Sequence, residues 1–272
     1  MHLDEIIIIP IILMLAFSFA VPMDDKKENL AIVSPTPTTT GGTAPLITPT
    51  PINCPATSTR SYTICQAYPG PGGFHPTPPA AQNYDINPIT IRGYTLFSAT
   101  KGFINLNPQP DDDPNAPQLY YILNKNPVFN NLYKIGRAPW DPPTLPYEVH
   151  IVELAANPND PIRVPEAGSS VLPCGKDVIV LFADQNNITL KYTQDDTVTG
   201  GYTLHISDIC VDPELLKLYQ QNSQTRNFLP ALQRNDILGI AKTNEIKVAI
   251  RDSGTFMDPR SKKDWWQRPS PL

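Results

Sequence analysis

The chain has 272 residues, of which 32 are proline, and a formal net charge of -5 at pH 7. Proline makes up about 12% of the residues, where roughly 5% is usual, so part of the chain is not expected to form regular structure. The charge is small and spread along the sequence, without the basic stripe that neutralises phosphates, which argues against nucleic acid as a partner.

The N-terminus, MHLDEIIIIPIILMLAFSFAVP, carries an apolar run over residues 6–19. This run is short for a membrane span, and small residues precede a cut after Ala20, so we expect a signal peptide over residues 1–20. The chain would then be secreted, and extracellular or associated with a cell wall. Asp4 and Glu5 stand where a signal peptide is usually basic, which leaves an uncleaved membrane anchor as the alternative.

Residues 21–88 predict a stalk or linker. The segment SPTPTTTGGTAPLITPTP, residues 34–51, has no charged or aromatic residue, so it cannot bury enough surface to offset its ordering entropy. In a secreted chain this composition indicates an O-glycosylated stalk or an unmodified flexible linker. Turn-forming residues continue to Pro88 and leave no room for long elements.

From Ile89 the pattern changes to short strands. The segments between clusters of Pro, Asn, Asp and Gly are rich in β-branched and aromatic residues: ITIRGYTLFSA, QLYYILN, YEVHIVELAA, DVIVLFA, ITLKYT and GGYTLHI. The last strand, NEIKVAIR, alternates, with Ile246, Val248 and Ile250 on one face. The pattern predicts a mainly β domain over residues 89–261, a small barrel or barrel-sandwich hybrid, followed by a C-terminal tail over residues 262–272.

One short helix is expected inside this domain. In VDPELLKLYQQ, Asp212 is a suitable N-cap and Pro213 stands at the first helical position. Leu215, Leu216 and Tyr219 recur at helical spacing and predict the buried face.

Four cysteines in an oxidising compartment are expected to form two disulfides, and three pairings are possible. Cys54 and Cys65 lie in the proline-rich part, whereas Cys174 and Cys210 lie in the predicted domain. The local pairing, Cys54 with Cys65 and Cys174 with Cys210, is therefore expected. The spacing typical of a zinc site is absent.

Four segments follow one another over roughly residues 151–260: PIRVPEAGSSV, YTLHIS, NDILGIA and IRDSGTFMDP. In this order they resemble the opening motif, the Y-x-H-L strand, the G-Q-x-I-G turn and the closing V-R-x-x-G-x-x-x-D-P of the M23 (lysostaphin-like) peptidases, a family of cell-wall endopeptidases. The resemblance implies a β-rich barrel-sandwich scaffold.

The resemblance does not extend to the zinc ligands of that family. Its H-x-H motif matches Glu245-Ile246-Lys247, and a lysine ammonium has no lone pair for a metal. No histidine is followed four residues later by an acid, as the family's H-x-x-x-D requires. The accessory histidine matches His205, which we interpret as an ordinary half-exposed strand histidine, with a remnant polar residue in a groove as the alternative. No metal and no cofactor are expected.

The sequence therefore predicts a non-catalytic module that binds cell-wall polysaccharide or an extracellular protein. An active extracellular hydrolase with a non-standard site is one alternative, for which His150, Glu153 and His205 are the candidate cluster. A structural surface protein is another. His75 lies among prolines without an evident partner.

Two further features bear on surfaces. Trp265 and Trp266, beside Lys262 and Lys263, are candidates for stacking on sugar rings, although packing against the domain is the alternative. Asn187-Ile188-Thr189 is an N-glycosylation sequon, and a glycan there would mark an outer surface.

Overall fold

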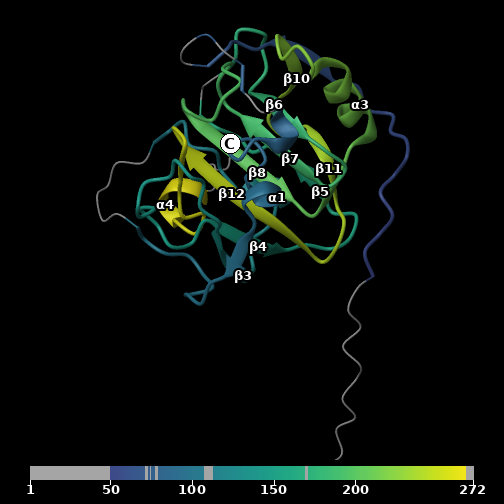
Figure 1. Cartoon of the computed structure of the whole chain (residues 1–272). Helices are drawn as coiled ribbons and strands as arrows, with labels where there is room; N and C mark the ends of the chain where they lie inside the picture. Colours follow the sequence, from purple (N-terminus) through teal and green to yellow (C-terminus); the bar gives the residue numbers. More distant parts are fainter. Residues whose placement is uncertain are drawn as a thin grey trace, which may run out of the picture. The chain divides into compact units, whose positions relative to one another are not determined.

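Two antiparallel β-sheets form the framework of the protein in the computed structural model (Figure 1). The structure describes residues 50–70, 73, 75–76, 79–106, 113–168 and 171–267, all within the unit Ile47–Leu272. The expected signal peptide, residues 1–20, and residues 21–49 of the expected stalk lie outside the described residues.

The strands of the larger sheet are β1 (Thr63–Gln66), β2 (Tyr94–Leu96), β3 (Phe129–Ile135), β4 (Ile151–Ala155), β6 (Val178–Ala183), β7 (Asn187–Lys191), β8 (Tyr202–Ser207), β10 (Phe228–Leu232), β12 (Glu245–Asp252) and β13 (Thr255–Phe256). They are ordered β1-β10-β6-β7-β8-β12-β4-β3-β2, and β13 pairs with β12. The smaller sheet has the order β5-β11-β9 and consists of β5 (Pro161–Arg163), β9 (Ile209–Val211) and β11 (Ile237–Ala241).

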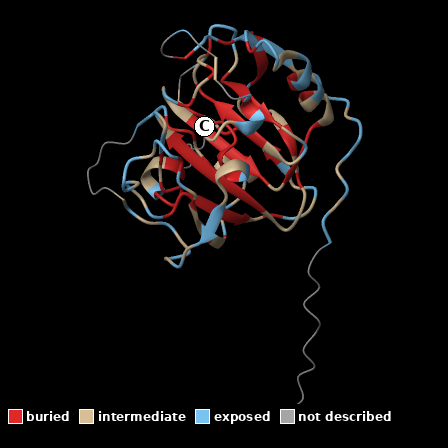
Figure 2. Ribbon diagram, in the orientation of Figure 1, coloured by how far each residue is buried: buried red, intermediate tan, exposed pale blue. Residues whose placement is uncertain are grey.

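The mainly β prediction is confirmed, and β12 shows why the alternation was informative. Ile246, Val248 and Ile250 are all fully buried. Strand β12 lies between β8 and β4 and pairs with both. The main core contains these side chains together with others from both sheets, and the central strands are buried along nearly their whole length (Figure 2).

The longest helix in the described chain, α3 (Pro213–Asn222), begins as predicted. The Asp212 carboxylate accepts a hydrogen bond of 3.0 Å from the backbone N–H of Glu214, and Leu215 and Tyr219 are buried. The expectation of a single helix is wrong, because shorter ones are also present: η1 (Ala80–Gln82), α1 (Pro88–Arg92), α2 (Tyr120–Leu123) and α4 (Lys262–Trp265). None of the helices described here is long and apolar enough to cross a membrane.

Helices α1 and α2 occupy segments for which strands were expected. In α1, Pro88 stands at the start, where its fixed φ suits a helix, and Gly93 ends the helix with a φ of 66°. Helix α2 ends at Asn124, which adopts the left-handed conformation with a φ of 50°. In these segments the helix-boundary preferences of Pro, Gly and Asn therefore outweigh the strand preference of the β-branched and aromatic residues.

The folded part begins well before residue 89, the expected boundary. Strand β1 pairs with β10 at the sheet edge, with Cys65 opposite Leu229. Ala67 and Ile86 are buried. A proline-rich segment without hydrophobic periodicity can still be ordered in this way, because the sheet edge supplies partners for its backbone groups.

The expected disulfide pairing is wrong. The bridges join Cys54 to Cys210 and Cys65 to Cys174, across 156 and 109 residues of sequence. Because the N-terminal segment runs extended along the domain, its two cysteines meet different parts of it. Both bridges therefore fasten this segment to the domain, and two disulfides are typical of an oxidising compartment.

Candidate functional site

The β12 face that carries Glu245 and Lys247 holds an ion pair. Lys247 of β12 lies opposite Glu153 of β4 in the register of the two strands. The Lys247 Nζ atom is 2.5 Å from Asp208 Oδ2 and 3.7 Å from Glu153 Oε2. Lys247 thus neutralises the carboxylates around it, as its hydrogen-bond chemistry allows.

Glu153 is buried, and both of its carboxylate oxygens have partners. Asn131 donates to Oε1 at 2.8 Å and the Tyr133 hydroxyl donates to Oε2 at 2.5 Å. Glu245 lies beside it, and burial together with the hydrogen bond to Glu153 raises the pKa of Glu245 above its usual value. Two carboxylates in contact repel each other, so the contact between Glu153 and Glu245 is more stable when the two groups share one proton.

His150 is a structural residue in this fold. Its Nδ1 accepts a hydrogen bond of 3.1 Å from the backbone N–H of Ile135, and its Nε2 donates to the Tyr147 carbonyl at 2.7 Å. Burial lowers the pKa of the imidazole below 6.5. Both ring nitrogens are therefore committed to backbone groups.

His205 of β8 is also buried, which corrects the expectation of a half-exposed histidine. Its Nδ1 lies 3.0 Å from the Thr189 hydroxyl, while Nε2 has no hydrogen-bond partner among the described residues. Burial, reinforced by Arg251 and Arg92, lowers the pKa of His205 well below 6.5. His150, Glu153 and His205 are at most 2% exposed, so the hydrolase cluster is out of reach of a polymer. The described residues contain no group of three or more His, Cys, Asp or Glu side chains that could hold a metal ion.

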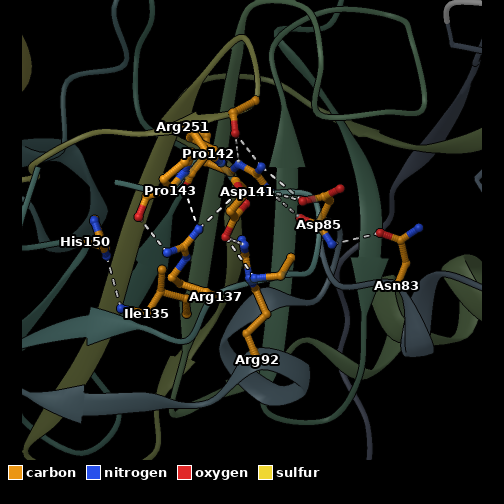
Figure 3. Close-up of polar contacts among 12 residues, drawn as sticks. Asn83, Asp85, Arg92, Ile135, Arg137, Asp141, Pro142, Pro143, His150 and Arg251 are labelled. Atoms are coloured by element: carbon orange, nitrogen blue, oxygen red, sulfur yellow. Dashed lines mark hydrogen bonds and ion pairs between the residues drawn. The ribbon is translucent and has the colours of Figure 1, made fainter. Parts of the chain in front are cut away.

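Two arginine–aspartate pairs join β12 and α1 to the loops beside them (Figure 3). Arg251 of β12 donates through Nη1 to Asp85 Oδ1 at 3.0 Å. Arg92 of α1 donates to the Asp141 carboxylate. The Arg92 side chain is fully buried, and its Nε and Nη1 have no hydrogen-bond partner within the described chain. Asp141 is therefore the charge partner on which Arg92 depends.

Both guanidinium groups also contact Phe256 of β13. The ring centroid is 4.5 Å from Arg251 Cζ and 5.2 Å from Arg92 Cζ, which is cation–π distance. His205 lies beside the same ring, with centroids 6.1 Å apart. The neighbourhood of His205 is thus filled by buried charge pairs and an aromatic ring.

His75, expected to have no partner, belongs to a polar cluster. Its Nδ1 lies 2.7 Å from Asp196 Oδ2, and its Nε2 lies 3.1 Å from Asn227 Oδ1. Arg226 Nε donates to the same Asp196 oxygen at 2.8 Å. His75 and Arg226 line a cavity of about 960 Å³ beside α3. The aspartate is 121 residues away in sequence, so no local pattern could have revealed the cluster.

A separate groove of about 910 Å³ lies where α4 meets the loops before α2 and β3. Phe103 is its exposed aromatic residue, with 43% of its surface accessible. The Phe103 ring packs edge to face against Trp266, with centroids 5.8 Å apart. The remaining residues that line this aromatic groove are Ile104, Asn105, Tyr120, Asn126, Pro127, Lys262, Lys263 and Gln267.

Backbone hydrogen bonds fix the walls of the aromatic groove. The Ile104 N–H donates to the Arg260 carbonyl, and the Lys262 N–H donates to the Ile104 carbonyl, each at 3.1 Å. The Leu119 N–H donates to the Trp265 carbonyl at 2.8 Å. Three segments distant in sequence are thereby held together without a ligand, so binding would require little ordering of the walls.

The two tryptophans play different parts. Trp265 is 2% exposed, and its Nε1 donates to the Asp258 carbonyl at 3.0 Å, so it is a core residue and not a sugar platform. Trp266 is also buried, with 6% of its surface exposed, and its Nε1 donates to the Pro259 carbonyl at 2.7 Å, but it additionally lines the groove. The expected tail over residues 262–272 is therefore folded as far as Gln267. Phe103 carried no sequence signal, because it stands alone in a loop.

Asn187, the residue expected to carry a glycan, is half-buried at the start of β7. Its Nδ2 donates to both carboxylate oxygens of Asp184, each at 2.9 Å. A glycan on Nδ2 would replace one of the two hydrogens that make these bonds. Thr189 of the sequon is buried. Glycosylation at Asn187 stays a prediction.

The sequence matches no protein-family model and none of the curated proteins with which it was compared. The likeness to M23 peptidases therefore remains a prediction from the four motifs.

Proposed function

We propose that this protein is a secreted, non-catalytic module that binds cell-wall glycan in the aromatic groove, on a scaffold similar to that of the M23 peptidases. The observation that carries the proposal is the pairing of an exposed aromatic residue, Phe103, with a pre-formed floor containing Trp266. The two disulfides support an extracellular location.

The chemistry of the groove suits a carbohydrate. A sugar ring has an apolar face that packs on an aromatic ring, and a rim of hydroxyl groups that need hydrogen-bond partners. Phe103 supplies the ring. Asn105, Asn126 and Gln267 also line the groove, and an amide group combines donors with an acceptor, as a hydroxyl requires. The Gln267 Nε2 already donates to the Lys263 carbonyl.

The alternatives have less support. A hydrolase would need its acid and base groups within reach of the substrate, whereas His150, Glu153 and His205 are buried and hydrogen-bonded to the fold. A purely structural role does not account for a pre-formed groove with an exposed aromatic residue.

The test is co-sedimentation of the full chain with insoluble chitin, β-glucan and peptidoglycan. We expect binding to at least one polymer, weakened by at least about fivefold in Phe103→Ala, since a central aromatic contact typically contributes more than about 1 kcal/mol. Phe228→Ala is the matched control, because Phe228 is similarly exposed, at 46%, but lies on β10 outside the groove. Absence of binding to all three polymers, or equal loss in both variants, would overturn the proposal.

A further inference from the structure

The aromatic groove is basic, although the chain is acidic overall. Of the ten described residues that line it, two are lysines and none is Asp or Glu, whereas the chain has 26 acidic and 21 basic side chains. This local reversal of charge calls for a ligand chemistry that a neutral sugar does not provide.

The two lysines are not equivalent. Lys263 Nζ lies 3.3 Å from Asp264 Oδ1, so its charge is already partly balanced. Lys262 Nζ lies 5.9 Å from the centroid of the Phe103 ring, and within the described residues it makes this contact without an ion pair. Lys262 therefore places over the Phe103 ring an ammonium group that has no ion pair in the part of the chain that the structure describes.

We infer that the groove selects a carboxylated oligosaccharide, with Lys262 binding the carboxylate of the sugar that packs on Phe103. The inference rests on the proposed function and specifies its ligand. In a uronic acid the carboxylate projects from the edge of the sugar ring. Lys262 Nζ lies over the Phe103 ring, so a sugar that stacks on that face displaces the ammonium group toward the ring edge. The carboxylate of the sugar projects at this edge, within reach of the flexible four-carbon stem of Lys262. A neutral sugar would leave the ammonium group without a partner.

The position of Lys262 is fixed by the fold. Its backbone N–H is bonded to Ile104, and its carbonyl accepts the Trp266 N–H at 3.2 Å. The backbone of Lys262 is thus held by two segments that line the groove, while its side chain is exposed.

The experiment compares two matched ligands by titration calorimetry with the full chain: hexagalacturonate and its fully methyl-esterified form, which has the same backbone without the charges. We expect hexagalacturonate to bind roughly two- to fivefold more tightly at low salt, the range for one exposed ion pair, and the difference to shrink at high salt. Lys262→Gln should abolish the difference. Lys263→Gln is the matched control and should leave most of the difference in affinity between the two hexamers.

Equal affinity for the two hexamers, or a preference that survives Lys262→Gln, would overturn the inference. These outcomes are distinct from failure of the proposed function. If both hexamers bind equally and Phe103→Ala weakens both, the groove is a glycan site without acidic selectivity. If neither hexamer binds and the neutral polymers also fail, the proposed function falls with the inference.

Discussion

The contact between His205 on β8 and Thr189 on β7, 3.0 Å from Nδ1 to Oγ1, can have only one direction. Thr189 has a single hydroxyl hydrogen, and it is donated to the Ile86 carbonyl at 2.6 Å. The hydroxyl oxygen must therefore accept from His205, so the proton of the neutral imidazole stands on Nδ1. This relay ties the sheet to the segment before α1.

Replacing Thr189 by Val is expected to destabilise the fold by about 1–3 kcal/mol, because it leaves the buried His205 N–H and the Ile86 carbonyl without their shared partner. Thr189→Ser keeps the hydroxyl and should restore most of the loss. Urea denaturation at pH 7.5 measures both, with the exposed Thr199→Val as control. A loss below about 0.5 kcal/mol in Thr189→Val would contradict the relay.

The two buried histidines predict acid sensitivity. Burial lowers the pKa of His150 and, with help from Arg251 and Arg92, lowers that of His205 well below 6.5. Below about pH 6.5 these histidines bind protons in the unfolded chain but stay neutral in the folded chain. The free energy of unfolding is therefore not reduced by them above this pH and decreases as the pH falls below it. Each histidine contributes up to about 1.4 kcal/mol per pH unit. Denaturation between pH 7.5 and 5 should show a shallower loss in His205→Gln, and identical slopes would refute the assignment.

Glu245 predicts a dependence of the opposite sign. Burial and Glu153 raise the pKa of Glu245. The folded chain therefore keeps a proton on Glu245 at pH values above 4.5, where the unfolded chain has released it. The free energy of unfolding decreases as the pH rises from about 4.5 through the pKa of Glu245 in the folded state. Glu245→Gln fixes a neutral side chain and should gain stability at pH 7.5 but not at pH 4. The gain is expected to stay below about 1 kcal/mol, because the site is partly exposed to solvent.

The matched control for Glu245→Gln is Glu148→Gln. Glu148 is exposed, and its carboxylate lies 3.6 Å from Lys134. It should show no pH-dependent gain. If both variants gain equally at pH 7.5, the Glu153–Glu245 contact does not hold a proton.

Asp141→Asn is expected to destabilise the protein by about 3 kcal/mol or more, because it leaves the fully buried Arg92 without its charge partner. Lys217→Met, in an exposed pair with Glu214 at 3.6 Å, should change the free energy of unfolding by less than about 0.5 kcal/mol. Urea denaturation compares the two. Similar, small effects would mean that Arg92 does not depend on Asp141.

The sequence predicts best what local pattern determines. The alternation in Ile246, Val248 and Ile250 and the capping signals at Asp212 and Pro213 each describe a few neighbouring residues, and the structure confirms them. The sequence does not predict helix α1, because most of its residues individually favour a strand. Pro88 and Gly93 set where the helix begins and ends.

What the sequence could not predict depends on distant contacts. Cys54 and Cys65 are near each other in sequence, yet the path of the chain along the domain brings each to a different partner. Phe103 becomes part of a groove only because residues 260–262 hold its loop beside Trp266. Trp265 and Trp266 are adjacent and both buried in the core, and only the packing of α4 decides that Trp266 also lines the groove.

Backbone hydrogen exchange of the full chain, with and without a soluble oligosaccharide of the polymer that binds, tests the central claim most directly. A glycan in the aromatic groove should slow exchange at residues 103–105 and 262–267 and leave the cavity beside α3 unchanged. Protection confined to residues 213–226, with none at residues 103–105, would contradict the assignment of the groove.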